Sequence, residues 1–256
     1  MAKYKISAER IDKLDQRWYA LSKDAQLKHV PSVTTIIEDG SGFPYGLVEW
    51  YKQHGMTSDY LLEISGHIGS EVHKLIEKTL KNEDVSIDDV IGAEGLKAHI
   101  WERYMRWCAF WYDLNNKHKV DYLPNSVEFI AYDWDLEYAG TVDFMATIDD
   151  EPTIFDWKTG KYIYPSSKIQ IATYAKTLNK TFGTNVQNCK IVHIPPIKSN
   201  KQGYTITTVD KVDERYNHFL AMLELYKLNH EGEKPKFLSF PTKITNSQII
   251  KTKIEV

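Results

Sequence analysis

One stretch of the chain, residues 140–161, constrains the fold more than any other. Its pattern predicts two short strands, 140–148 and 152–158, joined by a tight turn at Asp149 and Asp150. Aspartate and proline favour turns, and the proline that follows this pair could not continue a central strand. The simplest two-residue turn, centred between the two aspartates, therefore predicts a β-hairpin.

The register implied by this turn brings charged side chains together. Asp143 is predicted to face Asp156 across the hairpin. Side chains alternate across a strand with a period of two, so both carboxylates lie on one face, together with Lys158. The opposite face is apolar and is predicted to consist of Val142, Phe144, Ala146, Ile148, Phe155 and Trp157.

Two opposed carboxylates require a compensating positive charge. Directly opposed side chains have Cβ atoms about 5 Å apart, and like charges at that distance destabilise a sheet. A divalent cation would offset the repulsion, because hard oxygen ligands suit Mg²⁺ and Mn²⁺. The alternative is a solvated hairpin face with two ordinary carboxylates, and a register slip of one residue would remove the argument.

Length and composition indicate an ordinary globular chain. We expect a single domain over residues 1–256, with 1–120 mainly helical, 121–210 holding the sheet and its following helix, and 211–256 forming a C-terminal helix and tail. The two cysteines permit neither a disulfide framework nor a four-cysteine metal or iron–sulfur site, so a cytoplasmic setting is expected. No apolar run approaches the roughly 18 residues of a membrane helix, and no membrane partner is expected.

The positive charge is distributed unevenly along the chain. The net charge of −3 argues against attraction of the whole protein to nucleic acid. However, the segment from Trp157 to Val209 contains no Asp or Glu and has eight lysines, among them Lys161, Lys168 and Lys176. A basic zone directly after a candidate metal site suits a phosphodiester substrate, and these lysines are candidate DNA contacts. The alternative is a scattered, solvated lysine face.

The remaining elements are predicted from periodicity, caps and turn residues. Helices are expected at 31–37 with Ser32 as N-cap, 45–54, 57–81, 93–116, 169–179 and 212–229, and strands near 17–21 and at 127–132, 190–194 and 203–209, with a loop at 40–44 and an irregular tail. Thr159-Gly160-Lys161-Tyr162 lacks the remaining residues of a phosphate-binding loop, and the chain has no His-Glu-x-x-His or Gly-x-Ser-x-Gly motif.

Four motifs, taken in order, resemble the motif series of the PD-(D/E)XK nucleases: Gly69-Ser70-Glu71-Val72-His73 with Glu77, Gly140-Thr141-Val142-Asp143, Asp156-Trp157-Lys158, and Gln170 with Tyr174. The chain is most similar to the RecB-type branch, which includes phage exonucleases and the mitochondrial genome maintenance exonuclease. Pro31-Ser32-Val33-Thr34 also resembles a segment of those members. The resemblance spans residues 29–210. It implies an α/β (α+β) fold with a helical N-terminal region and a mixed central sheet flanked by helices, a restriction-endonuclease-like core that cuts DNA with Mg²⁺ or Mn²⁺.

Some RecB-type relatives carry an iron–sulfur cluster on four cysteines, which this chain cannot build. The resemblance therefore implies a small stand-alone nuclease, phage-encoded or bacterial and acting in the host cytoplasm. A recombination or replication protein is a candidate partner.

The resemblance also implies roles for the residues that would bind metal. Asp143 and Asp156 would be the metal carboxylates, the Trp157 carbonyl a further ligand, and His73 the histidine ligand. Lys158 would position or activate the attacking water and offset charge in the transition state. On the residues alone, His73 would be a packed or surface histidine.

Further positions match accessory parts of the family site. Gln170 and Tyr174 would hold the substrate or the geometry of the active site, although a surface helix would show the same spacing. Glu77 and Glu128 would be accessory acids near the metal, and each could equally be a solvated charge.

Three functions follow from this reading. The first is a metal-dependent DNA exonuclease acting on single-stranded or frayed ends in recombination, repair or replication. The second is a structure- or site-specific DNA endonuclease with the same chemistry. The third is a non-catalytic DNA-binding module, against which the opposed carboxylates weigh, because they would repel phosphate.

Overall fold

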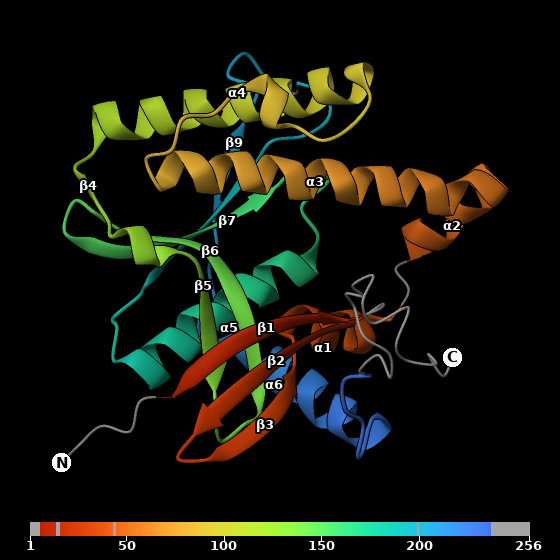
Figure 1. Ribbon diagram of the computed structural model, residues 1–256, viewed down its shortest axis with the longest axis vertical. Helices are drawn as coiled ribbons and strands as arrows, with labels where there is room; N and C mark the ends of the chain where they lie inside the picture. Colours follow the sequence, from red (N-terminus) through yellow and green to blue (C-terminus); the bar gives the residue numbers. More distant parts are fainter. Residues whose placement is uncertain (1–5, 14–15, 43–44, 199, 237–256) are drawn as a thin grey trace, which may run out of the picture.

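The computed structural model describes residues 6–13, 16–42, 45–198 and 200–236, and it places a mixed sheet between two layers of helices (Figure 1). The strands of this sheet are β4 (Val120–Asp121), β5 (Val127–Asp133), β6 (Tyr138–Ile148), β7 (Glu151–Lys158), β8 (Asn188–His193) and β9 (Thr205–Thr208). Their order is β4-β6-β7-β8-β9, with β5 also paired to β6. Only β7 and β8 run parallel among these pairs. The predicted α+β fold with a mixed central sheet is confirmed.

Helices cover both faces of this sheet. One face carries α3 (Ser58–Leu80) and α4 (Glu94–Lys117), and the other carries α1 (Val33–Ser41), α5 (Pro165–Phe182) and α6 (Val212–Asn229). The remaining helix, α2 (Tyr45–His54), leads into α3 (Figure 1). Short 3₁₀ turns occupy Gly55–Thr57, Ile87–Asp89 and Pro124–Ser126. No helix in the described ranges has both the length and the apolar character needed to cross a bilayer.

The first strands of the chain form a separate small sheet. β1 (Ser7–Lys13), β2 (Gln16–Lys23) and β3 (Gln26–Pro31) pair antiparallel in sequence order, whereas only a strand near 17–21 was expected. The sheet packs on the β5–β6 hairpin through buried Tyr19, whose hydroxyl lies 2.9 Å from Thr141 Oγ1. The N-terminal part, expected to be mainly helical, therefore also contains a sheet, which adds a further layer beside the strand that carries Asp143.

The predicted β6–β7 hairpin is present. Asp149 and Asp150 adopt φ values of 50° and 69°, which suit the two-residue type I′ turn that matches the twist of paired strands. Ile148 pairs with Glu151, as predicted. On the apolar face, five of the six predicted side chains pack beneath α3 and α4, but Val142 packs in the opposite cluster, against α5.

The predicted helices are confirmed, with bounds that shift by a few residues. Ser32 caps α1 by accepting a 2.9 Å hydrogen bond from the Thr35 amide. Because α1 continues to Ser41, the loop expected at 40–44 begins later, and 43–44 lie outside the described residues. Most of the predicted irregular tail, 237–256, also lies outside them.

Candidate active site

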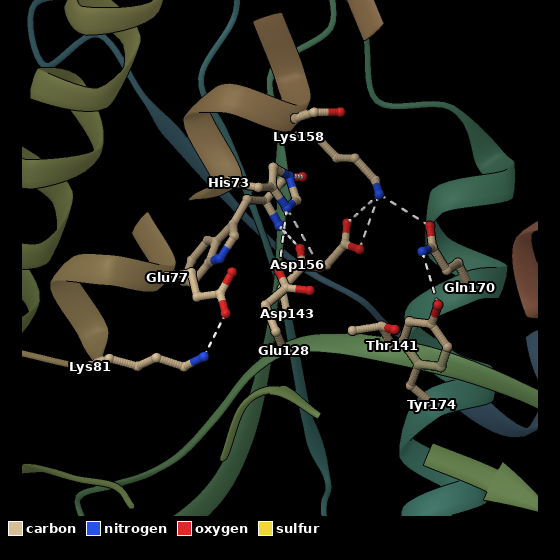
Figure 2. A network of polar contacts seen from close by, with 12 residues as sticks. His73, Glu77, Lys81, Glu128, Thr141, Asp143, Asp156, Lys158, Gln170 and Tyr174 are labelled. Carbon is tan, nitrogen blue, oxygen red and sulfur yellow. Dashed lines mark hydrogen bonds and ion pairs between the residues drawn. The ribbon is translucent and has the colours of Figure 1, made fainter. Parts of the chain in front are cut away.

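Seven of the predicted site residues come from five elements and meet at one end of the β6–β7 hairpin (Figure 2). β6 supplies Asp143, and β7 supplies Asp156 and Lys158. His73 arrives from α3 and Glu128 from β5, while α5 contributes the Gln170 and Tyr174 side chains. The network therefore joins α3 to α5, which lies about a hundred residues later in the chain.

The two aspartates do not pair as predicted. The β6–β7 register is the expected one, but the pairing ends at Phe144 and Phe155, one position before Asp143 and Asp156. At that position Asp143 Oδ2 accepts a 2.8 Å hydrogen bond from the Trp157 amide. The Asp143 carboxylate thus binds the Trp157 amide just beyond the point where the pairing between β6 and β7 ends.

Three side chains form a group that could hold a cation. His73 Nδ1 lies 3.7 Å from Glu128 Oε1 and 3.7 Å from Asp143 Oδ1, and one ligand atom from each residue lies within 4.8 Å of the other two. A nitrogen with two carboxylate oxygens is a donor set that fits Mn²⁺ and, through its oxygens, Mg²⁺. Glu128, expected as an accessory acid, is a full member of this group, whereas Asp156 is not.

The backbone at Glu128 is unusual. Its φ of 49° is in the left-handed region, and its position interrupts the β5–β6 pairing between Val127–Phe144 and Phe129–Val142. A non-glycine residue held there costs on the order of 1–3 kcal/mol, and such residues concentrate at functional sites. The strain is consistent with a carboxylate held in place toward His73.

The Trp157 carbonyl orients the histidine. It lies 3.1 Å from His73 Nε2, which can donate a hydrogen bond to it while Nδ1 faces the two carboxylates. An acceptor on the second ring nitrogen is the usual way in which a protein orients a metal-binding histidine. In this arrangement the Trp157 carbonyl orients His73, and its expected role as a direct metal ligand stays a prediction.

Asp156, Lys158, Gln170 and Tyr174 form a chain of polar contacts beside that group. Lys158 Nζ donates to Asp156 Oδ1 at 3.0 Å and to Gln170 Oε1 at 3.1 Å. Gln170 Nε2 in turn donates to the Tyr174 hydroxyl at 3.2 Å. Asp156 is 2% exposed, and its Oδ2 lies 2.9 Å from the ammonium without accepting a hydrogen bond from any described residue. This oxygen is thus in ionic contact with Lys158, and a cation could use its remaining acceptor capacity.

The charges of the site shift its pKa values. Burial lowers the pKa of His73, but the charges of Asp143 and Glu128 outweigh it and raise this pKa to about 9. Burial raises the pKa of Asp156 to about 6; Lys158 opposes this shift and the Asp143 charge adds to it. Burial acts to lower the pKa of Lys158, but the two aspartates prevail and raise it, so this side chain remains an ammonium at neutral pH.

Gly140 explains how Tyr174 reaches the site. A Cβ placed on Gly140 would lie 2.5 Å from Tyr174 Cε1, so only glycine allows this ring to lie against β6. Tyr174 is 3% exposed, and burial raises its pKa well above the ordinary value. The buried ring therefore holds a neutral hydroxyl in place, and this hydroxyl accepts the hydrogen bond from Gln170.

The site opens into a cleft of about 730 Å³. The lining includes the predicted His73, Glu77, Glu128, Asp143, Lys158, Gln170 and Tyr174. It also includes Arg10 from β1 and Arg17 from β2, which the sequence reasoning missed because nothing in their local pattern sets them apart. Glu77 lines the cleft, but its carboxylate pairs with Lys81 Nζ at 2.5 Å.

The three predicted DNA-binding lysines lie outside the cleft lining. Lys176 pairs with Asp213 of α6 at 2.7 Å. Lys168 lies near Asp210, whose pKa is lowered mainly by its hydrogen bond with Arg215 and also by the Lys168 charge. Lys161 belongs to the loop between β7 and α5, where its ammonium lies 5.2 Å from the centre of the Tyr162 ring. The positive charge on the cleft comes instead from Arg10, Arg17 and residues of α3 and β7.

No known family profile matches the chain, and no curated protein matches it significantly.

Proposed function

We propose that this protein is a deoxyribonuclease dependent on Mg²⁺ or Mn²⁺, an exonuclease that hydrolyses phosphodiester bonds at single-stranded or frayed DNA ends. The observation that carries the proposal is the convergence of His73, Glu128 and Asp143 beside the Asp156–Lys158 pair, at the wall of one open cleft. Paired acids with a neighbouring ammonium suit phosphodiester hydrolysis, and the order of the motifs resembles that of the PD-(D/E)XK nucleases.

His73, Glu128 and Asp143 would hold the cation, with Asp156 as a further carboxylate ligand. When bound, this ion lowers the pKa of a water molecule and offsets charge on the scissile phosphate. The protein's own groups then fix geometry and protonation. Lys158, held by Gln170 and Asp156, places a positive charge where negative charge develops in the transition state.

The cleft supports DNA as the substrate class. Arg10, Arg17, Lys74 and Lys158 line it, and guanidinium groups bind phosphate oxygens through paired hydrogen bonds. Lys74 also pairs with Glu71, and the two guanidinium groups would add further positive charge for a backbone that passes the site. Binding of this kind weakens as salt rises, because counterions compete for the phosphates.

The proposal is tested with end-labelled single- and double-stranded oligonucleotides, with and without Mg²⁺ or Mn²⁺. Lys158→Ala and Asp156→Ala should lower the cleavage rate by about 10²- to 10³-fold while DNA binding persists. Lys119→Ala is the matched control, because this exposed lysine pairs with Asp121 and Asp150 at the turn end of the hairpin. Full cleavage by either site variant, or in excess chelator, would refute the assignment.

A circular single-stranded substrate separates the two modes of cutting. An exonuclease needs an end, so it should leave the circle intact and degrade the same molecule once it has been linearised. Cleavage of the circle would assign the same chemistry to an endonuclease.

A further inference from the structure

The loop at 159–164, which joins β7 to α5, exposes two large aromatic side chains. Tyr162 is 57% exposed and Tyr164 is 50% exposed, whereas Ile163 between them packs against the core. The two rings lie 6.4 Å apart at an interplanar angle of 82°. Because Ile163 points inward, the two tyrosine rings lie on the outer side of the loop.

This loop borders the cleft. Lys158 precedes it and Ser166 follows it, and both residues line the cleft. We propose that Tyr162 and Tyr164 form a stacking platform for the unpaired bases of a DNA strand that enters the cleft, so that the site selects single strands or frayed ends over paired duplex. The inference rests on the proposed nuclease function and adds the residues that would read strandedness.

Hydrogen bonds hold the loop backbone near both of its ends. The Gly160 carbonyl lies 2.8 Å from His193 Nε2, and the Tyr164 carbonyl accepts a 3.1 Å hydrogen bond from the Ser167 amide. At the start of the loop, a Cβ placed on Gly69 of α3 would lie 3.1 Å from Thr159 Oγ1. The hydrogen bonds to β8 and α5 lower the entropy lost when a ligand binds, because less of the loop remains to be ordered.

The chemistry of the loop fits unpaired bases. Every nucleobase has a flat face that can stack on an aromatic ring, and bases in an intact duplex offer that face only at the ends. Lys161 adds an ammonium 5.2 Å from the Tyr162 ring centre, so a backbone phosphate beside a stacked base would meet positive charge. The loop contains no acidic residue that would repel the strand.

Binding and cleavage are measured separately. A single-stranded oligonucleotide carrying 2-aminopurine reports stacking through quenched fluorescence, in chelator so that no strand is cut, and a closed hairpin duplex serves as the paired probe. The variants are Tyr162→Ala, Tyr164→Ala, their double variant and the double Phe variant, which keeps both rings. Tyr112→Ala is the matched control. This tyrosine is 70% exposed on α4, and no residue of α4 lines the cleft.

Each alanine variant should weaken single-strand binding by about 5- to 150-fold and reduce the quenching, with duplex binding unchanged. The Phe variant and Tyr112→Ala should behave as wild type. Equal loss on both probes, loss in the Phe variant, or wild-type binding by the double alanine variant would overturn the platform. So would a wild-type protein that does not bind the single strand. Failure of the nuclease proposal is a different result, namely no metal-dependent cleavage by the wild type on any DNA.

Discussion

The buried Asp156 carboxylate should destabilise the metal-free protein, and Asp156→Asn should relieve that cost. Its pKa of about 6 exceeds the ordinary 3.8 because burial disfavours the charged form. Each pKa unit corresponds to about 1.4 kcal/mol, so the charge costs up to about 3 kcal/mol when fully ionised. Asparagine has nearly the same shape without the charge, and its oxygen can still accept the hydrogen bond from Lys158.

The pH dependence has a definite sign. A carboxyl whose folded pKa is raised disfavours the fold only where it is ionised, so the cost is absent below pH 3.8, grows up to about pH 6 and is then constant. Thermal unfolding in chelator at pH 8 should therefore show the variant melting about 5 to 10 °C higher. The difference should shrink toward pH 4. Added Mn²⁺ should stabilise the wild type more than the variant.

Asp133→Asn is the matched control for this effect. Asp133 is also buried, at 1% exposure, but it accepts hydrogen bonds from the Asp135 and Leu136 amides and pairs with Lys180 at 2.5 Å. Removing that charge should destabilise the protein by about 1–3 kcal/mol, the opposite sign. A metal-free Asp156→Asn protein that melts at or below the wild-type temperature at pH 8 would refute the reasoning.

The remaining predictions test other parts of the site. Because the pKa of His73 is about 9, Mn²⁺ must displace a proton from this side chain at lower pH. Calorimetry should show proton release at pH 7.5, and the affinity for Mn²⁺ should rise about tenfold per pH unit. An affinity that does not change with pH would count against His73 as a ligand. Gly140→Ala should clash with Tyr174 and lower the melting temperature and the activity together. Adding Tyr174→Ala to the same chain should recover part of the stability. If the two substitutions instead lower stability additively, the contact is refuted. Ser32→Ala should cost about 1 kcal/mol in urea unfolding through loss of the α1 cap, and no change would contradict that role.

The sequence predicted the elements whose signals are local. The β6–β7 hairpin followed from Asp149 and Asp150, because a two-residue turn fixes register by counting alone. The helix over Tyr45–His54 and the cap at Ser32 likewise depend on neighbours in the chain. These features need no knowledge of tertiary packing, so they could be derived before any coordinates.

Other features depend on contacts between distant segments. Glu128 lies beside His73 and Asp143 because its backbone adopts a φ of 49° where β5 runs along β6. No sequence pattern predicts this backbone conformation. Arg10 and Arg17 reach the cleft only because an unanticipated small sheet packs on β5 and β6. The charge count along the chain did not predict which lysines line the cleft, since Lys176 faces α6 instead.

Trp157 contributes both to the polar site and to the hydrophobic core, so a shift in the register of β7 would disrupt both. Its amide and carbonyl contact Asp143 and His73, while its indole packs at ring-centre distances of 6.0 Å from Phe110 and 5.7 Å from Phe155. Sliding the strand by one residue would turn the indole into the polar cleft and drive a carboxylate among the aromatic rings. A chain that misaligns this strand would thus lose its hydrophobic packing together with the geometry of the polar site, so few folded molecules with a disrupted site should accumulate.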